Sequence, residues 1–179
     1  MNTDTPIRFY RAVGDWGFLS NLWRVPVRII PHRADALTPR TFRSAEEAYQ
    51  YAKPRSHDVA EWLIAAPKPH LCAAAAHALL GFDIRPDWQA VKVDWMRAVL
   101  YAKFRQHLGL AWKLIGTGER ELIEESTTDA FWGIGRKGNG QNMLGVLLTE
   151  TRTTLRSELA PPRPRAPRDR RVGRGGLRG

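Results

Sequence analysis

The sequence predicts an α+β domain that is rich in helices and has a few short strands, followed by a basic tail that does not fold. Three observations lead to this class. Segment 87–107 has apolar residues at helical spacing over its whole length, whereas segment 7–30 is rich in β-forming residues and is broken by turn signals. Strands and helices do not alternate regularly, as a βαβ array would require. We therefore expect one compact domain over residues 1–159 and a disordered tail rich in Arg, Pro and Gly over residues 160–179.

Composition limits the class of protein. The chain has 179 residues, which suffices for one domain with its own core. No window approaches the roughly 18 uninterrupted apolar residues of a membrane span, and the first residues lack the pattern of a signal peptide. The single cysteine, Cys72, has no partner for an internal disulfide, which agrees with a reducing compartment. We expect a cytoplasmic protein with no membrane contact.

The positive charge is concentrated at the C-terminus. Residues 161–179 hold seven arginines and one aspartate, and therefore +6 of the net charge of +10. Such a segment is attracted to phosphate backbones, which makes nucleic acid a candidate partner. An incidental basic extension explains the same composition, and the sequence leaves both interpretations open.

The first half of the chain gives a strand-rich start and one capped helix. Segment 7–30 predicts short strands joined by loops, and segment 31–42 predicts a loop because of its prolines and polar residues. Ser44-Ala-Glu-Glu47 fits a capping box, so a helix should begin at Ala45. Pro54 should end it near Lys53, because the residue before a proline is pushed out of the helical region.

The second half of the chain gives further helices. Segments 58–66 and 70–80 have helical patterns, and segment 87–107 is the clearest helix, with Asp87 as its candidate cap and Gly109 at its end. "ELIEES" fits either a short strand or a helical turn. Apolar residues from Met143 to Leu155 mark a final amphipathic helix. We expect Trp88 and Trp95 mainly in the core.

A glycine-rich segment precedes that final helix. "FWGIGRKGNG" (131–140) contains G-x-G-x-x-G, but no buried strand leads into it and no second half of a dinucleotide-binding unit follows it. A Walker loop would require Lys-Ser or Lys-Thr where the chain has Asn139-Gly140. We expect instead a loop that approaches an anionic ligand closely, with Asp129 and Trp132 at its entry. A mobile surface loop is the alternative.

A polar face is predicted on the helix that follows Ser44. Glu46, Gln50 and Lys53 stand at i, i+4 and i+7 and share that face. A solvated salt bridge is the ordinary interpretation of such a pair of charges. The sharper one is a general acid/base, Glu46, beside a nucleophilic amine, Lys53, whose pKa is lowered by burial. The chain has no zinc-binding cysteine cluster and no H-E-x-x-H, so we expect chemistry without a metal or a cofactor.

Four stretches, taken together and in order, make the chain similar to a known family. They are "FLSN" (18–21), "SAEEAYQYAK" (44–53), "DWQAVKVDWMRAVLYAKFRQH" (87–107) and "DAFWGIGRKGNGQNMLG" (129–145). They resemble the NADAR family, also called YbiA-like, over roughly residues 7–156. The resemblance implies a compact α+β fold and hydrolysis of the N-glycosidic bond between a phosphorylated ribose and a heterocyclic base.

The resemblance also implies roles for individual residues. Glu46 would be the acid/base, Lys53 the amine that captures ribose C1 as a Schiff base, and Asp129 a group that orients the ribose or assists proton transfer. Substrate contacts are then expected from the residues Phe18, Ser20, Asn21, Gln50, Trp132, Gly133, Gly135 and Asn142. The chain departs from the family's pattern at Glu47, where a histidine is common.

Two substrate classes go with the resemblance. One consists of early phosphoribosylamino-pyrimidine intermediates of riboflavin biosynthesis, and the other of guanine in DNA that carries ADP-ribose. The basic tail favours the second class slightly, because it suits a macromolecular substrate. A non-catalytic sensor that binds ADP-ribose or a nucleotide is the alternative to an enzyme, as is a structural protein that binds nucleic acid through its tail.

Overall fold

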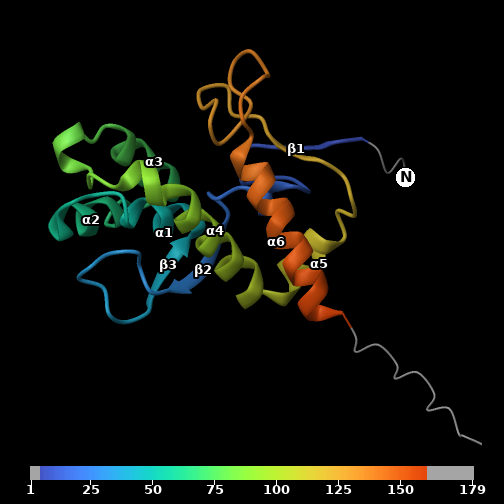
Figure 1. Ribbon diagram of the computed structural model, residues 1–179, viewed down its shortest axis with the longest axis horizontal. Coiled ribbons are helices and arrows are strands. Elements are labelled where there is room, and N and C mark those ends of the chain that lie inside the picture. The colour runs from blue at the N-terminus through green and yellow to red at the C-terminus, as the bar shows by residue number, and fades with distance from the viewer. Residues whose placement is uncertain (1–4, 161–179) are drawn as a thin grey trace, which may run out of the picture.

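The computed structural model describes residues 5–160, and it confirms the predicted α+β class with its many helices and few strands (Figure 1). All but the first residue of the tail predicted over 160–179 lies outside the described residues. In chain order the elements are β1 (Ile7–Phe9), η1 (Gly17–Leu19), β2 (Arg24–Ile29), β3 (Arg40–Ser44), α1 (Ala45–Tyr51), α2 (His57–Ile64), α3 (Pro69–His77), η2 (Gly81–Asp83), α4 (Trp88–Gln106), α5 (Leu108–Ile115), β4 (Leu122–Glu124) and α6 (Met143–Leu159).

The strands form two separate two-stranded sheets. β1 pairs in parallel with β4, with Phe9 opposite Glu124, and β2 pairs antiparallel with β3, with Val27 opposite Phe42. "ELIEES" therefore contains a strand. The expectation of a loop over 31–42 was wrong at its end, because β3 begins at Arg40. Pairing with β2 and burial of Phe42 outweigh the polar local composition there.

α1 begins where the capping box places it. The Ser44 Oγ accepts a hydrogen bond from the Glu47 backbone N–H at 3.2 Å. In a capping box the Glu47 carboxylate would accept from the backbone N–H of Ser44. Here its Oε2 accepts instead from the backbone N–H of Arg43 at 2.9 Å and from the Arg43 guanidinium at 3.0 Å. Glu47 is buried and has a structural partner. The helix itself ends at Tyr51, two residues before Lys53.

The long helix predicted over 87–107 is confirmed as α4, and a second helix follows it directly. α4 ends at Gln106, and the chain turns at His107 into α5, a helix that the sequence analysis did not predict. Gly109 lies in the first turn of α5 instead of ending α4. An apolar face explains why the chain continues as a helix, since Ala111 and Leu114 are fully buried.

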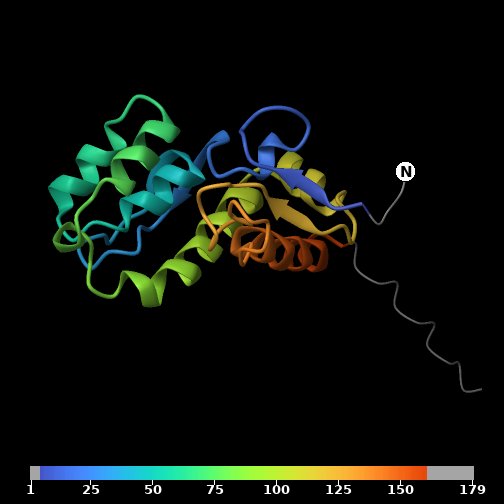
Figure 2. The same ribbon diagram turned by 90° about the horizontal axis from the view of Figure 1, so that it is seen from above.

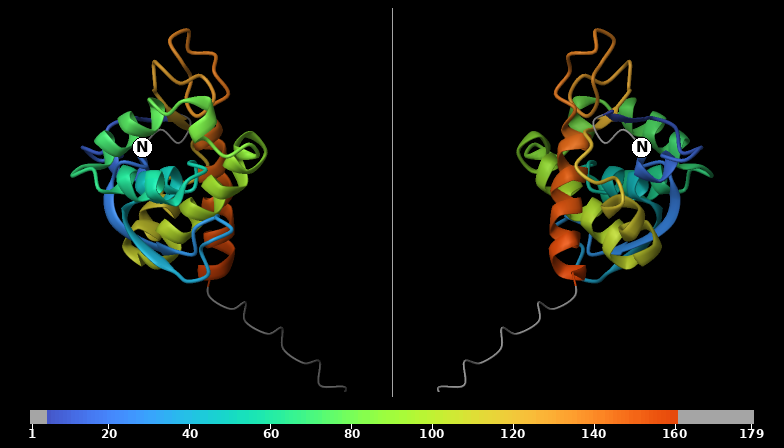
Figure 3. Two further views of the ribbon diagram at one scale, coloured as in Figure 1. Left: turned by 90° about the vertical axis from the view of Figure 1, so that its left-hand side faces the viewer. Right: turned by 90° about the vertical axis from the view of Figure 1, so that its right-hand side faces the viewer.

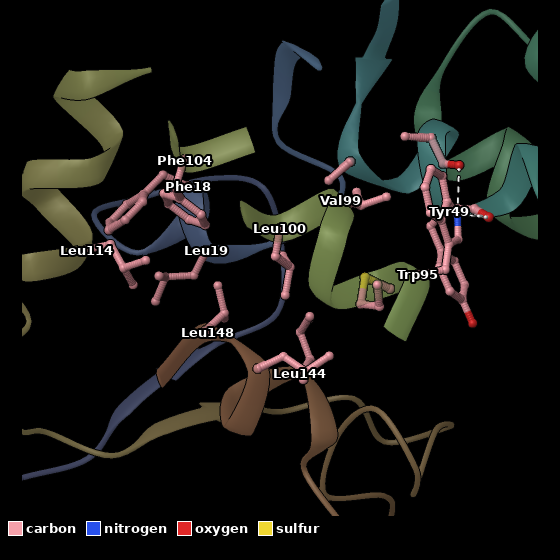
Figure 4. Packing of buried hydrophobic residues seen from close by; sticks show 14 of the residues in the cluster. Phe18, Leu19, Tyr49, Trp95, Val99, Leu100, Phe104, Leu114, Leu144 and Leu148 are labelled. Carbon is pink, nitrogen blue, oxygen red and sulfur yellow. Dashed lines mark hydrogen bonds between the residues drawn. The ribbon is translucent and has the colours of Figure 1, made fainter. Parts of the chain in front are cut away.

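α4 forms the centre of the molecule. Figures 1 and 2 show α1, α2 and α3 with the β2–β3 sheet on one side of it, and α5, α6 and the β1–β4 pair on the other. Apolar side chains from both sides meet on α4 in one cluster, and Figure 4 shows Leu100 and Phe104 between η1, α5 and α6. At the other end of α4, Trp95 is buried and donates to the Ala48 carbonyl oxygen of α1 at 3.2 Å.

The segment that joins β4 to α6, residues 125–142, projects beyond the N-terminal end of α6 (Figure 3). We call it the β4–α6 loop; it includes the glycine-rich segment. Its base is held to the end of β4, because Ile134 N–H donates to the Glu124 carbonyl oxygen at 3.0 Å. The loop therefore stands where α1, α4 and β4 come together.

Candidate active site

A cleft of about 420 Å³ opens between α1, α3, α4, the end of β4 and the β4–α6 loop. Its lining includes seven of the residues expected from the sequence to form the site, which the chain brings together from positions more than 100 residues apart: Ser20, Asn21, Glu46, Gln50, Lys53, Asp129 and Trp132. Further lining comes from Tyr10, Leu22, Tyr49, Ala73, His77, Ile84, Trp88, Gln89, Lys92, Met96, Glu124, Ser126, Thr128 and Leu144. Trp88 is 4% exposed and thus belongs to both the core and the cleft wall.

α1 contributes the predicted polar face to this cleft. The Gln50 Nε2 donates to the Glu46 Oε1 at 2.8 Å, one helical turn apart as the spacing requires. Burial raises the pKa of the Glu46 carboxyl, and the nearby Asp129 carboxylate raises it further, while Gln50 and Lys53 act in the opposite direction. Glu46 therefore retains its proton to a higher pH than an exposed glutamate does.

Lys53 lies just beyond the last turn of α1. Its Nζ donates to the Ala76 carbonyl oxygen of α3 at 2.6 Å. Burial lowers the pKa of this amine, and the negative charge of Glu46 only partly counteracts the effect. A larger fraction of the amine is consequently neutral near pH 7, the form in which an amine acts as a nucleophile.

Asp129 begins the turn that carries the aromatic pair. Its Oδ1 accepts from the backbone N–H groups of Phe131 and Trp132, each at 2.8 Å. The Trp132 ring stands edge-on to Tyr49 of α1 at a centroid distance of 5.5 Å. The Lys92 Nζ lies 3.8 Å from the centroid of the Phe131 ring. These contacts fix a carboxylate, an indole and a cation along one side of the cleft.

Ser20 and Asn21 form a short segment behind Glu46. The Asn21 carbonyl oxygen accepts from the Glu46 N–H at 3.0 Å, and the Ser20 carbonyl oxygen accepts from the buried Lys103 Nζ at 2.8 Å. The segment thereby ties the start of α1 to α4. Within the described residues, three buried polar atoms of the cleft lining have no hydrogen-bond partner: Asn21 Oδ1, Gln50 Oε1 and Glu124 Oε2. Buried polar atoms are normally paired, so each of these three can form a further hydrogen bond.

Four residues expected to touch the substrate do not line the cleft. Phe18 is 2% exposed and packs in the core, with its ring centroid 6.3 Å from that of Phe104. Phe18 belongs to η1, whose residues are all buried, so its apolar side chain is part of the core.

Gly133, Gly135 and Asn142 shape the β4–α6 loop from behind. A Cβ atom placed on Gly133 would lie 2.7 Å from the Glu124 carbonyl oxygen, and Gly135 has a φ of +64°. Asn142, in the left-handed region at φ 50°, accepts from the Glu124 N–H at 3.0 Å and donates to the Leu122 carbonyl oxygen at 2.8 Å. The glycines serve close backbone packing, and of the loop residues expected at the site only Asp129 and Trp132 line the cleft.

Glu124 is a cleft residue that was not predicted from the sequence. This residue is the last of β4 and lines the cleft. Burial, with additional contributions from Glu46 and Asp129, raises the pKa of its carboxyl to about 8. The available signal was a single acidic residue at the end of the apolar run Leu122-Ile123, five positions before Asp129.

Two kinds of feature are absent from residues 5–160. No three side chains of His, Cys, Asp or Glu there come close enough together to hold a metal ion. No helix in that part of the chain combines the length and the apolar character that crossing a membrane requires.

Comparisons with known proteins agree with the arrangement of these elements. The NADAR domain family model matches residues 8–156. The chain is 33% identical over 159 residues to the N-glycosidase YbiA of Escherichia coli, covering 87% of this chain and 91% of that protein. It is 32% identical over 158 residues to the riboflavin biosynthesis protein VVA0006 of Vibrio vulnificus, of which it covers 40%. The NMR structure of Escherichia coli YbiA superimposes with a TM-score of 0.73 over 87% of each chain.

Proposed function

Because this chain belongs to the NADAR family, we propose that it is a hydrolase that cleaves the N-glycosidic bond between a phosphorylated ribose and a heterocyclic base. Early phosphoribosylamino-pyrimidine intermediates of riboflavin biosynthesis are the leading substrates, in keeping with relatives named N-glycosidase and riboflavin biosynthesis protein. The observation that carries the proposal is one cleft in which Glu46 and Lys53 have pKa shifts in opposite directions. Paired shifts of this kind provide an acid and a nucleophile at the same pH.

Glu46 is the proton donor in this mechanism. The base is a poor leaving group as an anion, so its nitrogen must receive a proton as the bond to ribose C1 breaks. Glu46 retains a proton through burial and lies beside Asp129 in the same cleft. After it has donated this proton, the resulting carboxylate is placed to accept one from the nucleophile.

Lys53 is the nucleophile. Its neutral amine forms a bond to C1 while the C1–N bond to the base breaks, and one ammonium proton then passes to Glu46. Glu46 passes this proton to O4 as the ring bond between C1 and O4 opens, which gives an iminium at C1. Water adds to the iminium carbon and gives one proton back to Glu46, and the amine then leaves as the hydroxyl proton moves to its nitrogen and the aldehyde of the ribose forms. Asp129 orients the ribose through its second carboxylate oxygen, since backbone amides already occupy Oδ1.

The remaining walls provide binding groups. The Trp132 indole offers a face for the heterocycle. The unpaired Asn21 Oδ1 and Gln50 Oε1 accept from ribose hydroxyls or from N–H groups of the base. Lys92, at the cleft wall, provides a positive charge for the ribose phosphate.

The proposal is tested by release of the base from a phosphoribosylamino-pyrimidine and from ADP-ribosylated guanine in DNA. Glu46→Gln and Lys53→Ala should each remove most of the activity, whereas Lys137→Ala, on the exposed tip of the β4–α6 loop, should not. Borohydride should trap an adduct at Lys53 during turnover. If the wild-type protein releases no base from either substrate, the enzyme proposal fails. Tight ligand binding that survives Lys53→Ala would then support the non-catalytic sensor instead.

A second groove favours ADP-ribosylated guanine as the alternative substrate. It has a volume of about 410 Å³ and shares Leu22 with the cleft. Arg11, Arg24 and Lys68 line it, and no ion pair to any of these three side chains occurs among the described residues. Trp23 adds an aromatic surface. A substrate with further phosphates and a second base would find complementary charge and a stacking partner there.

The double variant Arg11→Ala/Arg24→Ala separates the two substrate classes. It should raise KM for ADP-ribosylated DNA about tenfold or more, by loss of two charge-assisted contacts, and leave KM for the pyrimidine substrate unchanged. Equal kinetics of the variant and the wild type on both substrates would remove the groove from substrate binding.

A further inference from the structure

We propose that Glu124 is a further catalytic residue of this cleft, and that its carboxyl acts in the neutral form as a hydrogen-bond donor to the departing base. This inference rests on the proposed N-glycosidase function. As the C1–N bond breaks, negative charge spreads over the acceptor atoms of the heterocycle. A donor aimed at such an atom in a site of low polarity stabilises the transition state more than the ground state.

The first line of support is where the carboxyl lies. Glu124 lines the cleft with Glu46 and Asp129, and its Oε2 is buried without a hydrogen-bond partner in the described residues. A buried carboxyl oxygen left unpaired is costly unless a ligand group meets it. No structural ion pair of the described chain involves Glu124, in contrast to its neighbour Glu125, which pairs with Arg8 at 3.0 Å.

The second line of support is how rigidly the backbone of Glu124 is held. Its N–H donates to the Asn142 side chain at 3.0 Å, and its carbonyl oxygen accepts from Ile134 at 3.0 Å. It pairs with Phe9 across the β1–β4 ladder. Gly133 packs directly on it, since a Cβ there would meet the Glu124 carbonyl oxygen at 2.7 Å. β1 and the β4–α6 loop thus hold the backbone that carries this carboxyl group at a defined point of the cleft wall, as preorganised catalysis requires.

The surroundings keep the carboxyl neutral. Burial is the largest cause that raises the pKa of Glu124, and the two other acidic groups of the cleft, Glu46 on α1 and Asp129 on the β4–α6 loop, raise it further. The other titratable or cationic side chains lining the cleft are Tyr10, Tyr49, Lys53, His77 and Lys92. Neither lysine forms an ion pair with Glu124 among the described residues, since the Lys53 Nζ donates to the Ala76 carbonyl oxygen and the Lys92 Nζ lies over the Phe131 ring.

The neutral form distinguishes this role from that of Glu46. Glu46 gives up its proton to the leaving nitrogen and must recover it, whereas Glu124 keeps its proton throughout and only shares it. A glutamine offers an N–H donor of nearly the same shape and cannot ionise. The Glu124→Gln variant should therefore still donate a hydrogen bond to the departing base, whereas the Glu124→Ala variant should not.

Kinetics on whichever of the two substrates the wild-type protein cleaves test this role. Glu124→Ala should lower kcat about 10²–10³-fold, the usual cost of removing one such donor. Glu124→Gln should stay within about tenfold of wild type and should lose the decline in kcat that wild type shows as the pH rises past about 8. The matched control is Glu125→Gln, an exposed neighbour, which should behave as wild type. Equal inactivity of the Gln and Ala variants, or full activity of the Ala variant, would overturn the proposal.

A second measurement does not depend on turnover. Carbon-detected NMR of the side-chain carboxyls of the full chain should show the Glu124 carboxyl titrating near pH 8. That signal should vanish in Glu124→Gln and persist in Glu125→Gln. A Glu124 carboxyl that is already ionised at pH 6 would overturn the neutral-donor role. If the wild-type protein cleaves neither substrate, the proposed function fails, and this titration still decides the state of Glu124.

Discussion

At the scale of single residues, the cleft works through burial. Glu46 and Glu124 are carboxyls with raised pKa values and Lys53 is an amine with a lowered pKa, and in all three cases removal from water is the largest cause. Each shift favours the uncharged form. The cleft therefore combines neutral acids with a partly neutral amine, a set of protonation states that exposed side chains do not reach at the same pH.

Replacing Glu46 tests the proton transfer. Glu46→Gln keeps the hydrogen bond to Gln50 in reach but has no proton to donate, so kcat should fall about 10²–10⁴-fold. The variant should remain folded, which urea denaturation can confirm. On substrates whose leaving group needs no proton, kcat of the Glu46→Gln variant should fall much less. A uniform loss across leaving groups would argue against Glu46 as the acid.

The Glu124 carboxyl also links stability to pH. Its pKa is raised from 4.5 to about 8 in the folded protein, so the folded state holds this proton more tightly than the unfolded chain. The resulting contribution to stability is complete below pH 4.5 and is lost as the pH rises through about 8. Relative to wild type, Glu124→Gln should gain about 1–3 kcal/mol in free energy of unfolding between pH 5 and pH 9. Urea denaturation at several pH values measures this, and Glu125→Gln should show no such gain.

At the scale of elements, α1 is placed by its N-terminus. The Ser44 cap begins the helix, and the Asn21 carbonyl oxygen holds the Glu46 N–H at 3.0 Å, so the register of the helix determines what faces the cleft. The β4–α6 loop plays the same part on the opposite wall. Its glycines allow the backbone to pack on the end of β4, and the turn at Asp129 presents Trp132.

Removing the cap of α1 should destabilise the fold. Ser44→Ala should lower the free energy of unfolding by about 1 kcal/mol, since it removes the acceptor for the Glu47 N–H. Ser56→Ala is the matched control, because Ser56 precedes α2 without a side-chain capping hydrogen bond. Urea denaturation of both variants measures the difference. Equal effects of the two substitutions would show that the Ser44 cap contributes nothing specific.

Adding a methyl group to the loop should disturb Glu124. Gly133→Ala places a Cβ 2.7 Å from the Glu124 carbonyl oxygen, and we expect a loss of about 1–3 kcal/mol in stability together with reduced kcat. Gly109→Ala is the control, because a Cβ there meets nothing within 4 Å. Denaturation and kinetics on both variants test the expectation, which a fully active and stable Gly133→Ala protein would contradict.

At the scale of the whole molecule, the cleft and the second groove, which is lined by Arg11, Arg24 and Lys68, share a wall at Leu22. The C-terminal residues 161–179 add +6 of the net charge of +10. A domain that cleaves a small metabolite has no need of these charges, whereas a domain that acts on DNA gains in association rate and affinity from them. The two substrate classes thus make different demands on the same chain.

Deleting residues 161–179 tests those demands. Cleavage of the pyrimidine substrate should be unchanged, because every lining residue of the cleft lies before position 145. With ADP-ribosylated DNA, KM should rise at low salt, and the salt dependence of KM should become less steep because fewer phosphates are neutralised. Kinetics at several salt concentrations measure both effects. An unchanged KM for DNA would show that the tail takes no part in substrate binding.

The sequence by itself determined the features that depend on neighbours along the chain. Ser44 and Glu47 predicted where α1 begins, the spacing of Glu46 and Lys53 placed them on one face, and the motifs indicated the NADAR family. Local pattern did not reveal β3 or α5, which follow from pairing with β2 and from burial of Leu114.

Only the tertiary structure decided which side chains meet in the cleft. In the folded protein Phe18 is buried in the core, and Gly133 and Asn142 pack against β4. Glu124 lines the same cleft as Glu46, although the two residues are 78 positions apart in the sequence. The physical reason is that burial and the proximity of charges, which set these pKa values, arise from elements that are distant along the chain.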